Sequence, residues 1–224
     1  MAASDYCRSQ MTARVVAPMD VSRPHGVISH PLDSTVLRVL VGTTQPLTGR
    51  QVARLADEGS QQGIGKALNR LVEEGVLERE EAGSSSLYTF NRQHLAAPAI
   101  ERLVSLRGEL LERLRQTFGE WEVEPVHASM FGSAARSDGD SASDIDLFIV
   151  RPEGVDGEDE TWRAQLGELA ESVWRWTGNH AGIAELSESE LPKLRRRRPP
   201  VLDELDADAI TLAGPEVGKL LRGG

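Results

Sequence analysis

Two short apolar segments separated by a polar stretch constrain this chain most strongly. Residues 126–131 and 145–150 are mostly apolar, and each has the length of a β-strand. The residues between them are rich in serine, glycine and aspartate, which favours a turn with a short helix. The segments therefore predict two neighbouring strands whose connection carries polar groups.

Asp144 and Asp146 stand at the start of the second apolar segment. Residues two apart on an extended backbone point to the same face, so both carboxylates would lie together and Ile145 and Leu147 would point away. Two like charges this close are unfavourable without a cation nearby. Mg²⁺ prefers oxygen ligands and often combines one or two carboxylates with substrate phosphates. The pair therefore predicts a magnesium site.

Gly132 and Ser133 directly follow the first apolar segment. A glycine lets the backbone approach a ligand closely, and N–H groups at the start of a helix can hold a phosphate. The Ser133 hydroxyl can donate to a phosphate oxygen, and Arg136, one turn further on, can add a cation. We expect this strand end to bind phosphate beside the strand that holds the metal ion.

The segment from Phe131 to Val150 reads FGSAARSDGDSASDIDLFIV. It resembles the signature of the DNA polymerase β-type nucleotidyltransferase superfamily, in particular its minimal nucleotidyltransferase branch, in which Gly-Ser precedes an acid-apolar-acid strand by about ten residues. The matching positions are Gly132, Ser133, Asp144 and Asp146. Arg136 matches a basic residue common in that branch, whereas Ser137 stands where glycine is frequent. The resemblance extends less specifically to about residue 214.

The resemblance implies a third carboxylate on a later strand. Glu185 lies between Ala184 and Leu186, which is the apolar–acid–apolar setting of that ligand. Many members have aspartate there, although aminoglycoside-modifying relatives have glutamate. Glu185 is then expected to ligate the metal ion and to act as a base towards the acceptor hydroxyl. The alternative is a solvent-facing glutamate on an edge strand.

The region before this signature predicts three short helices. Apolar residues recur at spacings of three and four in segments that begin after Asp33, Thr48 and Ser60. Each of these residues can cap a helix through its side-chain oxygen. The third segment ends at Gly75, which suits a helix C-terminus.

After Gly75 the apolar period falls to two. Residues 76–80 and 87–90 are expected to form a β-hairpin with a turn at residues 83–86. Three helices and a hairpin, with the segments LTGRQVARLAD and ALNRLVEEGVLERE, resemble a winged helix-turn-helix over residues 33–92. The resemblance implies that the third helix could enter a DNA major groove.

Polar side chains on and near the third helix are the candidate DNA contacts, because these residue types bind phosphates and base edges. They are Arg50, Gln61, Gln62, Lys66, Asn69 and Arg70. The predicted hairpin, however, carries Glu78, Glu80 and Glu81, and DNA affinity depends on neutralising phosphates. A module that mediates dimerisation or partner contact is the alternative.

These segments divide the chain into four parts and predict the α+β class. Residues 1–30 lack apolar periodicity and are expected to be a disordered tail. The winged helix-turn-helix follows at residues 31–92, and a linker helix is expected over residues 93–120. The minimal nucleotidyltransferase fold, a small mixed β-sheet flanked by helices, is expected at residues 121–224. The basic run Arg195–Arg198 is interpreted as a solvated helix end, with a polyanion-binding role as its alternative.

Composition limits the classes of function. The 35 acidic and 25 basic residues give a net charge of −10, and the acidic excess lies after residue 92. An acidic region repels polyphosphate, so nucleotide chemistry there would need metal ions. Cys7 is the only cysteine, which excludes an intrachain disulfide. With no signal-peptide pattern and no long apolar run, we expect a cytoplasmic protein without a membrane partner.

Together these features predict an Mg²⁺-dependent nucleotidyltransferase of the EC 2.7.7 type. It would move an NMP, with ATP favoured as the NTP, to a hydroxyl of a protein or RNA acceptor. By analogy with the family, the fusion suggests a component of a toxin–antitoxin or defence system with a partner protein. The alternative is a DNA-binding regulator or antitoxin whose nucleotidyltransferase fold only senses nucleotide or holds a partner.

Overall fold

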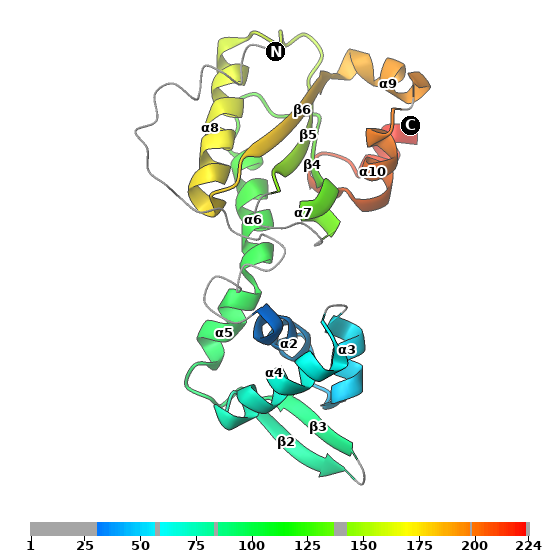
Figure 1. Cartoon of the computed structure of the whole chain (residues 1–224). Coiled ribbons are helices and arrows are strands. Elements are labelled where there is room, and N and C mark those ends of the chain that lie inside the picture. The colour runs from blue at the N-terminus through cyan, green and yellow to red at the C-terminus, as the bar shows by residue number, and fades with distance from the viewer. Residues whose placement is uncertain (1–30, 57–58, 83–84, 137–142, 198, 223–224) are drawn as a thin grey trace.

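The computed structural model describes residues 31–222 except residues 57–58, 83–84, 137–142 and 198. The expected tail at residues 1–30 and part of the hairpin turn lie outside the described residues. Figure 1 shows two groups of elements joined by consecutive helices, here called the N-terminal lobe (residues 31–104) and the C-terminal lobe (residues 106–222). Helices and two small sheets together confirm the expected α+β class.

The N-terminal lobe begins with three helices and a three-stranded antiparallel sheet. These elements are α2 (Pro31–Val41), β1 (Leu47–Thr48), α3 (Gly49–Ala56), α4 (Gln61–Glu73), β2 (Leu77–Ala82) and β3 (Ser85–Phe90), and the lobe ends with α5 (Ala97–Val104). The strand order is β1-β3-β2, so the hairpin gains a short third strand from the segment before α3. The buried core is contributed by these helices, the hairpin and Ala97, with Leu40, Ile64 and Leu77 almost fully enclosed.

Two of the three expected helix caps agree with the structure. The Ser60 side chain accepts a hydrogen bond from the Gly63 N–H at 3.1 Å, and Thr48 accepts one from the Gln51 N–H at 3.3 Å. Asp33 is not a cap, because α2 begins at Pro31. Its carboxylate instead accepts a hydrogen bond from Arg70 Nε at 3.0 Å, which ties α2 to α4.

The expected single linker helix is two helices, α5 (Ala97–Val104) and α6 (Leu106–Gly119). The Ser105 N–H bonds to the carbonyls of the last turn of α5, and α6 starts with the next residue. The two helices pack on different cores. Val104 of α5 contacts the N-terminal core, whereas Leu114 of α6 is buried in the C-terminal lobe.

The C-terminal lobe is built on a mixed four-stranded sheet of order β6-β5-β4-β7. Its strands are β4 (His127–Phe131), β5 (Ile145–Arg151), β6 (Ala181–Ser187) and β7 (Ile210–Ala213). β4 is antiparallel to β5 and β7, and β5 is parallel to β6. The parallel pair is connected through α8 (Glu160–Thr177), as such pairs require a long crossover.

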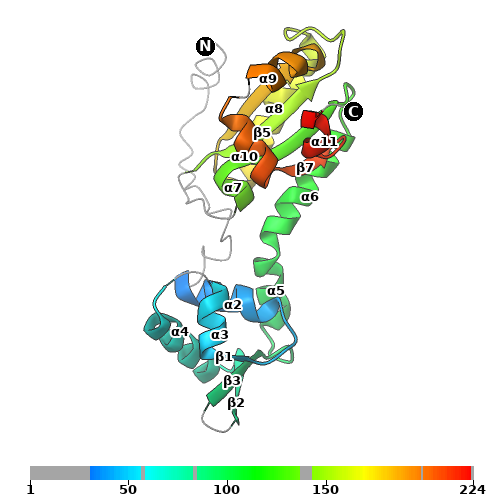
Figure 2. The same ribbon diagram turned by 90° about the vertical axis from the view of Figure 1, so that its right-hand side faces the viewer.

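Helices cover both faces of this sheet. Leu147 and Ile149 of β5 pack with α6 and α8 on what we call the α8 face. Phe148 and Val150 pack on the α10 face, which is covered by α9 (Leu191–Arg197), α10 (Val201–Asp208) and α11 (Val217–Arg222). Figure 2 shows α9, α10 and α11 on one side of the sheet, with α7 (Gly132–Arg136) beside α10. No described helix is both long and apolar enough to cross a membrane.

Candidate active site

Asp144 and Asp146 lie at the start of β5, where the sheet meets the connection from β4. Asp146 is the second residue of β5 and is partly buried, and Asp144 immediately before the strand is exposed. Asp146 is paired with Phe131, the last residue of β4. The strand end that precedes Gly132 therefore lies directly beside the acidic pair, as the spacing predicted.

The carboxylate of Asp146 is held between two glycines. A Cβ atom at Gly132 would lie 2.8 Å from Asp146 Oδ2, and one at Gly182 of β6 would lie 2.7 Å from Oδ1. Both distances are shorter than van der Waals contact, so any side chain at either position would displace the carboxylate. Gly132 also has a φ of +69°, which glycine adopts readily and other residues rarely do. The two glycines make the space that Asp146 occupies.

The pKa of Asp146 is raised above its ordinary value. Burial is the largest cause, followed by the negative charges of Asp144 and of Glu204 on α10. Each of these effects disfavours the ionised carboxylate. A bound cation would reverse them, because it would compensate the negative charges.

Helix α7 starts directly after β4 and carries the predicted phosphate contacts. Ser133 is partly exposed, and Arg136 forms an ion pair with Asp208 of α10 at 3.2 Å. Arg136 therefore lies on the side of α7 that faces α10. The structure brings Gly132 to the Asp146 carboxylate and keeps Ser133 and Arg136 on the same short helix.

Glu185 does not join the acidic pair. It is paired with Ile149 in the parallel β5–β6 ladder, whereas Asp146 is paired with Gly182. Since side chains alternate along a strand, Glu185 belongs to the α8 face and Asp146 to the α10 face. The expectation of Glu185 as a third ligand fails here because Glu185 lies an odd number of residues from Gly182, the residue beside Asp146, and so points to the other face of the sheet. The spacing in the sequence could not reveal this strand register.

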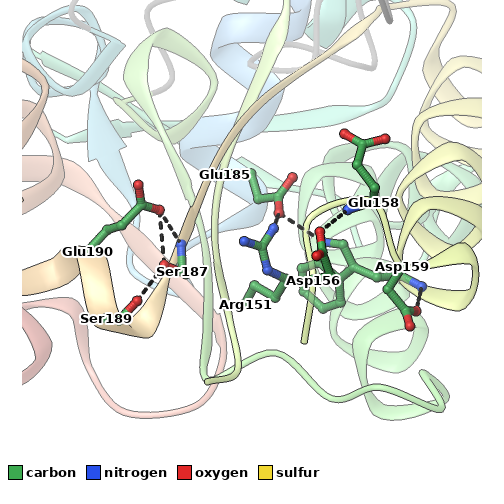
Figure 3. A network of polar contacts seen from close by, with 9 residues as sticks. Arg151, Asp156, Glu158, Asp159, Glu185, Ser187, Ser189 and Glu190 are labelled. Atoms are coloured by element: carbon green, nitrogen blue, oxygen red, sulfur yellow. Dashed lines mark hydrogen bonds and ion pairs between the residues drawn. The ribbon is translucent and has the colours of Figure 1, made fainter. Parts of the chain in front are cut away.

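Glu185 has structural partners instead. It forms an ion pair with Arg151 of β5, and its Oε1 accepts a hydrogen bond from Trp162 Nε1 of α8 at 2.9 Å. Figure 3 shows the Glu185 carboxylate directed at Arg151. The side chains of Arg151 and Glu185 are only 14% and 18% exposed, so the pair is mostly removed from water. The hydrogen bond from Trp162 links the start of α8 to β6.

Comparison with protein families gives a match over part of the chain. Residues 108–177 match the model of the nucleotidyltransferase domain. The matched range runs from α6 through β4, α7 and β5 to the end of α8, and it ends before Glu185. Comparisons with curated proteins and with solved structures give no significant match. The match supports a transferase of the nucleotidyltransferase type.

The donor set of the acidic pair fits a hard divalent cation. Asp144 and Asp146 supply carboxylate oxygens at the end of one strand, and Asp146 has a raised pKa that a cation would lower again. Among the residues that the structure describes, no three histidine, cysteine or acidic side chains gather as a complete ligand set.

Two residues near the site were not found by sequence reasoning. Gly182 borders Asp146 from β6, and Glu204 adds a negative charge from α10. A glycine in a strand is a known sign of close approach, so Gly182 could have been noticed. Glu204 gave no signal, because only the packing of α10 brings it near β5.

The candidate DNA contacts of the N-terminal lobe divide into two groups. Five are exposed or lie at the lobe surface, namely Arg50, Gln61, Gln62, Lys66 and Asn69. Arg70 forms an ion pair with Asp33 and links α4 to α2 within the lobe. A groove of about 560 Å³ runs between α4 and the hairpin and is lined by Arg50, Gln61, Gly65, Ser85, Ser86 and Tyr88, among others.

Proposed function

We propose that this protein transfers an NMP, with AMP favoured, from an NTP to a hydroxyl of a protein or RNA acceptor in an Mg²⁺-dependent reaction of the EC 2.7.7 type. The observation that carries the proposal is the Asp146 carboxylate seated between Gly132 and Gly182, next to Asp144. The family match over residues 108–177 supports it independently.

The proposed roles follow from the positions of the residues. The main chain of Gly132 and the hydroxyl of Ser133 bind the triphosphate, and Arg136 contributes positive charge. Asp144 and Asp146 would hold Mg²⁺, which would neutralise the charge of the triphosphate. An acceptor hydroxyl attacks the α-phosphorus in line and releases its proton to solvent, and pyrophosphate leaves. Positioning of the two substrates supplies much of the rate, and Glu185 takes no part.

The test is incubation of the purified protein with each of the four α-labelled NTPs, Mg²⁺ and a cell extract. We expect label in RNA or in protein, with ATP the best donor, and loss of that label in Asp144→Ala. Glu153→Ala is the matched control, because Glu153 is an exposed acid just after β5. Equal labelling by Asp144→Ala and by the unchanged protein would refute the proposal.

A toxin–antitoxin or defence role is part of the same proposal and rests on the sequence resemblance. It predicts that the labelled acceptor is a specific partner rather than bulk RNA or protein. Purification of the chain from its source cell, followed by identification of the labelled molecule, tests this. Labelling spread evenly over many acceptors would contradict it.

A second candidate function is DNA binding by the N-terminal lobe as a winged helix-turn-helix. The groove between α4 and the hairpin supports it, because Arg50, Gln61 and Ser86 line it with hydrogen-bond donors. In this alternative the C-terminal lobe binds nucleotide without transfer, in keeping with the position of Glu185 away from the acidic pair.

A gel shift with DNA from the upstream region of the gene tests the second function. Arg50→Ala combined with Lys66→Ala should weaken binding by about tenfold or more, because each lost phosphate contact removes counterion release. Arg102→Ala, an exposed cation on α5, is the control. No shift at low salt with the unchanged protein would exclude this function for that DNA.

A further inference from the structure

Arg107 connects the helix between the lobes to the short helix at the candidate site. It is the second residue of α6, and its Nη2 atom donates hydrogen bonds to two carbonyl oxygens of α7. The distances are 2.7 Å to the Ala135 oxygen and 3.2 Å to the Ala134 oxygen. A residue far from β5 in the sequence thus contacts the turn that contains Gly132 and Ser133.

The two carbonyls lie near the C-terminal end of α7 as the structure describes it. Helix α7 has only five residues, and the last carbonyls of any helix lack partners within it. Ala134 is buried, so water does not readily replace a protein donor there. The guanidinium of Arg107 supplies charge-assisted hydrogen bonds, which are stronger than neutral ones, and its charge suits the C-terminal end of a helix.

The environment of Arg107 indicates that these carbonyls are its main partners. Burial lowers the pKa of the guanidinium, although an arginine stays charged at neutral pH. Its Nε is buried without a hydrogen-bond partner, and no carboxylate within the described part of the chain forms an ion pair with it. The cation is therefore held at α7 by the two carbonyls rather than by an acidic neighbour.

We propose that Arg107 is a positioning residue that fixes α7, and with it Gly132 and Ser133, in the geometry that binds the NTP triphosphate. This inference rests on the proposed transferase function. The anchor is firm because Leu110 and Leu111, one turn further along α6, are buried in the C-terminal core. Arg107 acts on nucleotide affinity through its hydrogen bonds to α7.

The test compares Arg107→Gln and Arg107→Lys in the full chain. Arg107→Gln should raise the KM for the NTP by about tenfold, which corresponds to the loss of roughly one charge-assisted hydrogen bond, while kcat changes little. Arg107→Lys keeps a charged donor and should restore KM to within about threefold. Arg115→Gln is the matched control, because Arg115 is an exposed residue of α6 whose only described ion pair is with Glu112 at 3.8 Å.

Hydrogen exchange gives a second readout that does not depend on activity. The amides of residues 133–136 should exchange faster in Arg107→Gln, while those of β4 and α8 stay unchanged. Lower stability with an unchanged KM, or unchanged exchange in α7, would overturn the inference. If the unchanged protein neither binds nor uses NTPs, the proposed function itself fails. If the unchanged protein transfers NMP and Arg107→Gln has the same KM for the NTP and the same exchange in α7, only this inference fails.

Discussion

Asp146 and Glu185 lie on opposite faces of the four-stranded sheet. Asp146 of β5 is paired with Gly182 of β6, and Glu185 lies three residues further along that strand. An odd separation reverses the face in a pleated strand. Glu185, which the signature resemblance favoured as a third ligand, thus forms the Arg151 ion pair. Mutations can therefore test whether Glu185 affects stability while Asp146 affects transfer.

Glu185→Gln should destabilise the protein and leave transfer intact. The change leaves the mostly buried Arg151 without a full counter-charge, at a cost of about 2–4 kcal/mol in the free energy of unfolding. Urea unfolding and labelled-NTP transfer at a temperature where the variant is folded measure the two effects. Loss of transfer without loss of stability would mean that Glu185 acts in catalysis after all.

Asp146→Asn should abolish transfer and slightly stabilise the metal-free protein. A carboxyl whose pKa is raised in the folded state contributes stability below its unfolded pKa and loses it as the pH rises through the raised value. At neutral pH the ionised group is therefore unfavourable, by less than about 1 kcal/mol because water screens it. Transfer should fall by about a hundredfold or more.

The measurement is thermal unfolding of Asp146→Asn and the unchanged protein at about pH 7, each with and without Mg²⁺ and NTP. Without them the variant should melt at or above the temperature of the unchanged protein. With them only the unchanged protein should gain stability, because only it retains both carboxylates. An equal gain in both proteins would contradict a metal site at Asp146.

Gly182→Ala should impair the site more than the fold. The added Cβ would lie 2.7 Å from Asp146 Oδ1, so the carboxylate must move. We expect transfer to fall by about tenfold or more, because small displacements of catalytic groups have large effects. Gly167→Ala is the control, since a Cβ there meets nothing within 4 Å, and on helix α8 it should stabilise by up to about 1 kcal/mol. Full activity of Gly182→Ala would show that Asp146 need not hold this position.

His127 predicts a pH dependence of stability that is independent of the active site. It is fully buried in β4, its Nδ1 lies 2.8 Å from the Pro215 oxygen, and its Nε2 lies 3.0 Å from Ser129 Oγ. Because a carbonyl only accepts, Nδ1 carries the proton and Nε2 accepts from Ser129. Burial lowers the pKa of this histidine, against the smaller opposing effects of Pro215 and the Glu216 charge.

A lowered pKa places the loss of stability on the acidic side. The neutral form is favoured in the folded state, so the contribution is complete above the ordinary value of 6.5 and is lost as the pH falls below it. Denaturant unfolding between about pH 8 and pH 5 should give a steeper fall for the unchanged protein than for His127→Gln. His180→Gln, at an exposed histidine, should keep the steep fall. Parallel curves for all three proteins would contradict this assignment.

Local features of the structure were predictable because they depend on neighbours along the chain. The capping of α4 by Ser60 and the strand that begins at Ile145 and carries Asp146 agree with the structure. The break at Ser105 was not predictable, since the apolar period continues through it and only the division between two cores explains it. Arg70 likewise looks like a surface cation in sequence but pairs with Asp33 across two helices.

The sequence alone determined the chemistry of the candidate site: two carboxylates on one strand face, after a Gly-Ser turn at the end of another strand. Spacing within one strand sets which side chains share a face, so no tertiary knowledge is needed. Only the tertiary structure decided that Gly182 borders Asp146, that Glu185 faces α8, and that Arg107 holds α7. Those relations depend on strand register and helix packing between segments distant in the chain, and no local pattern encodes them.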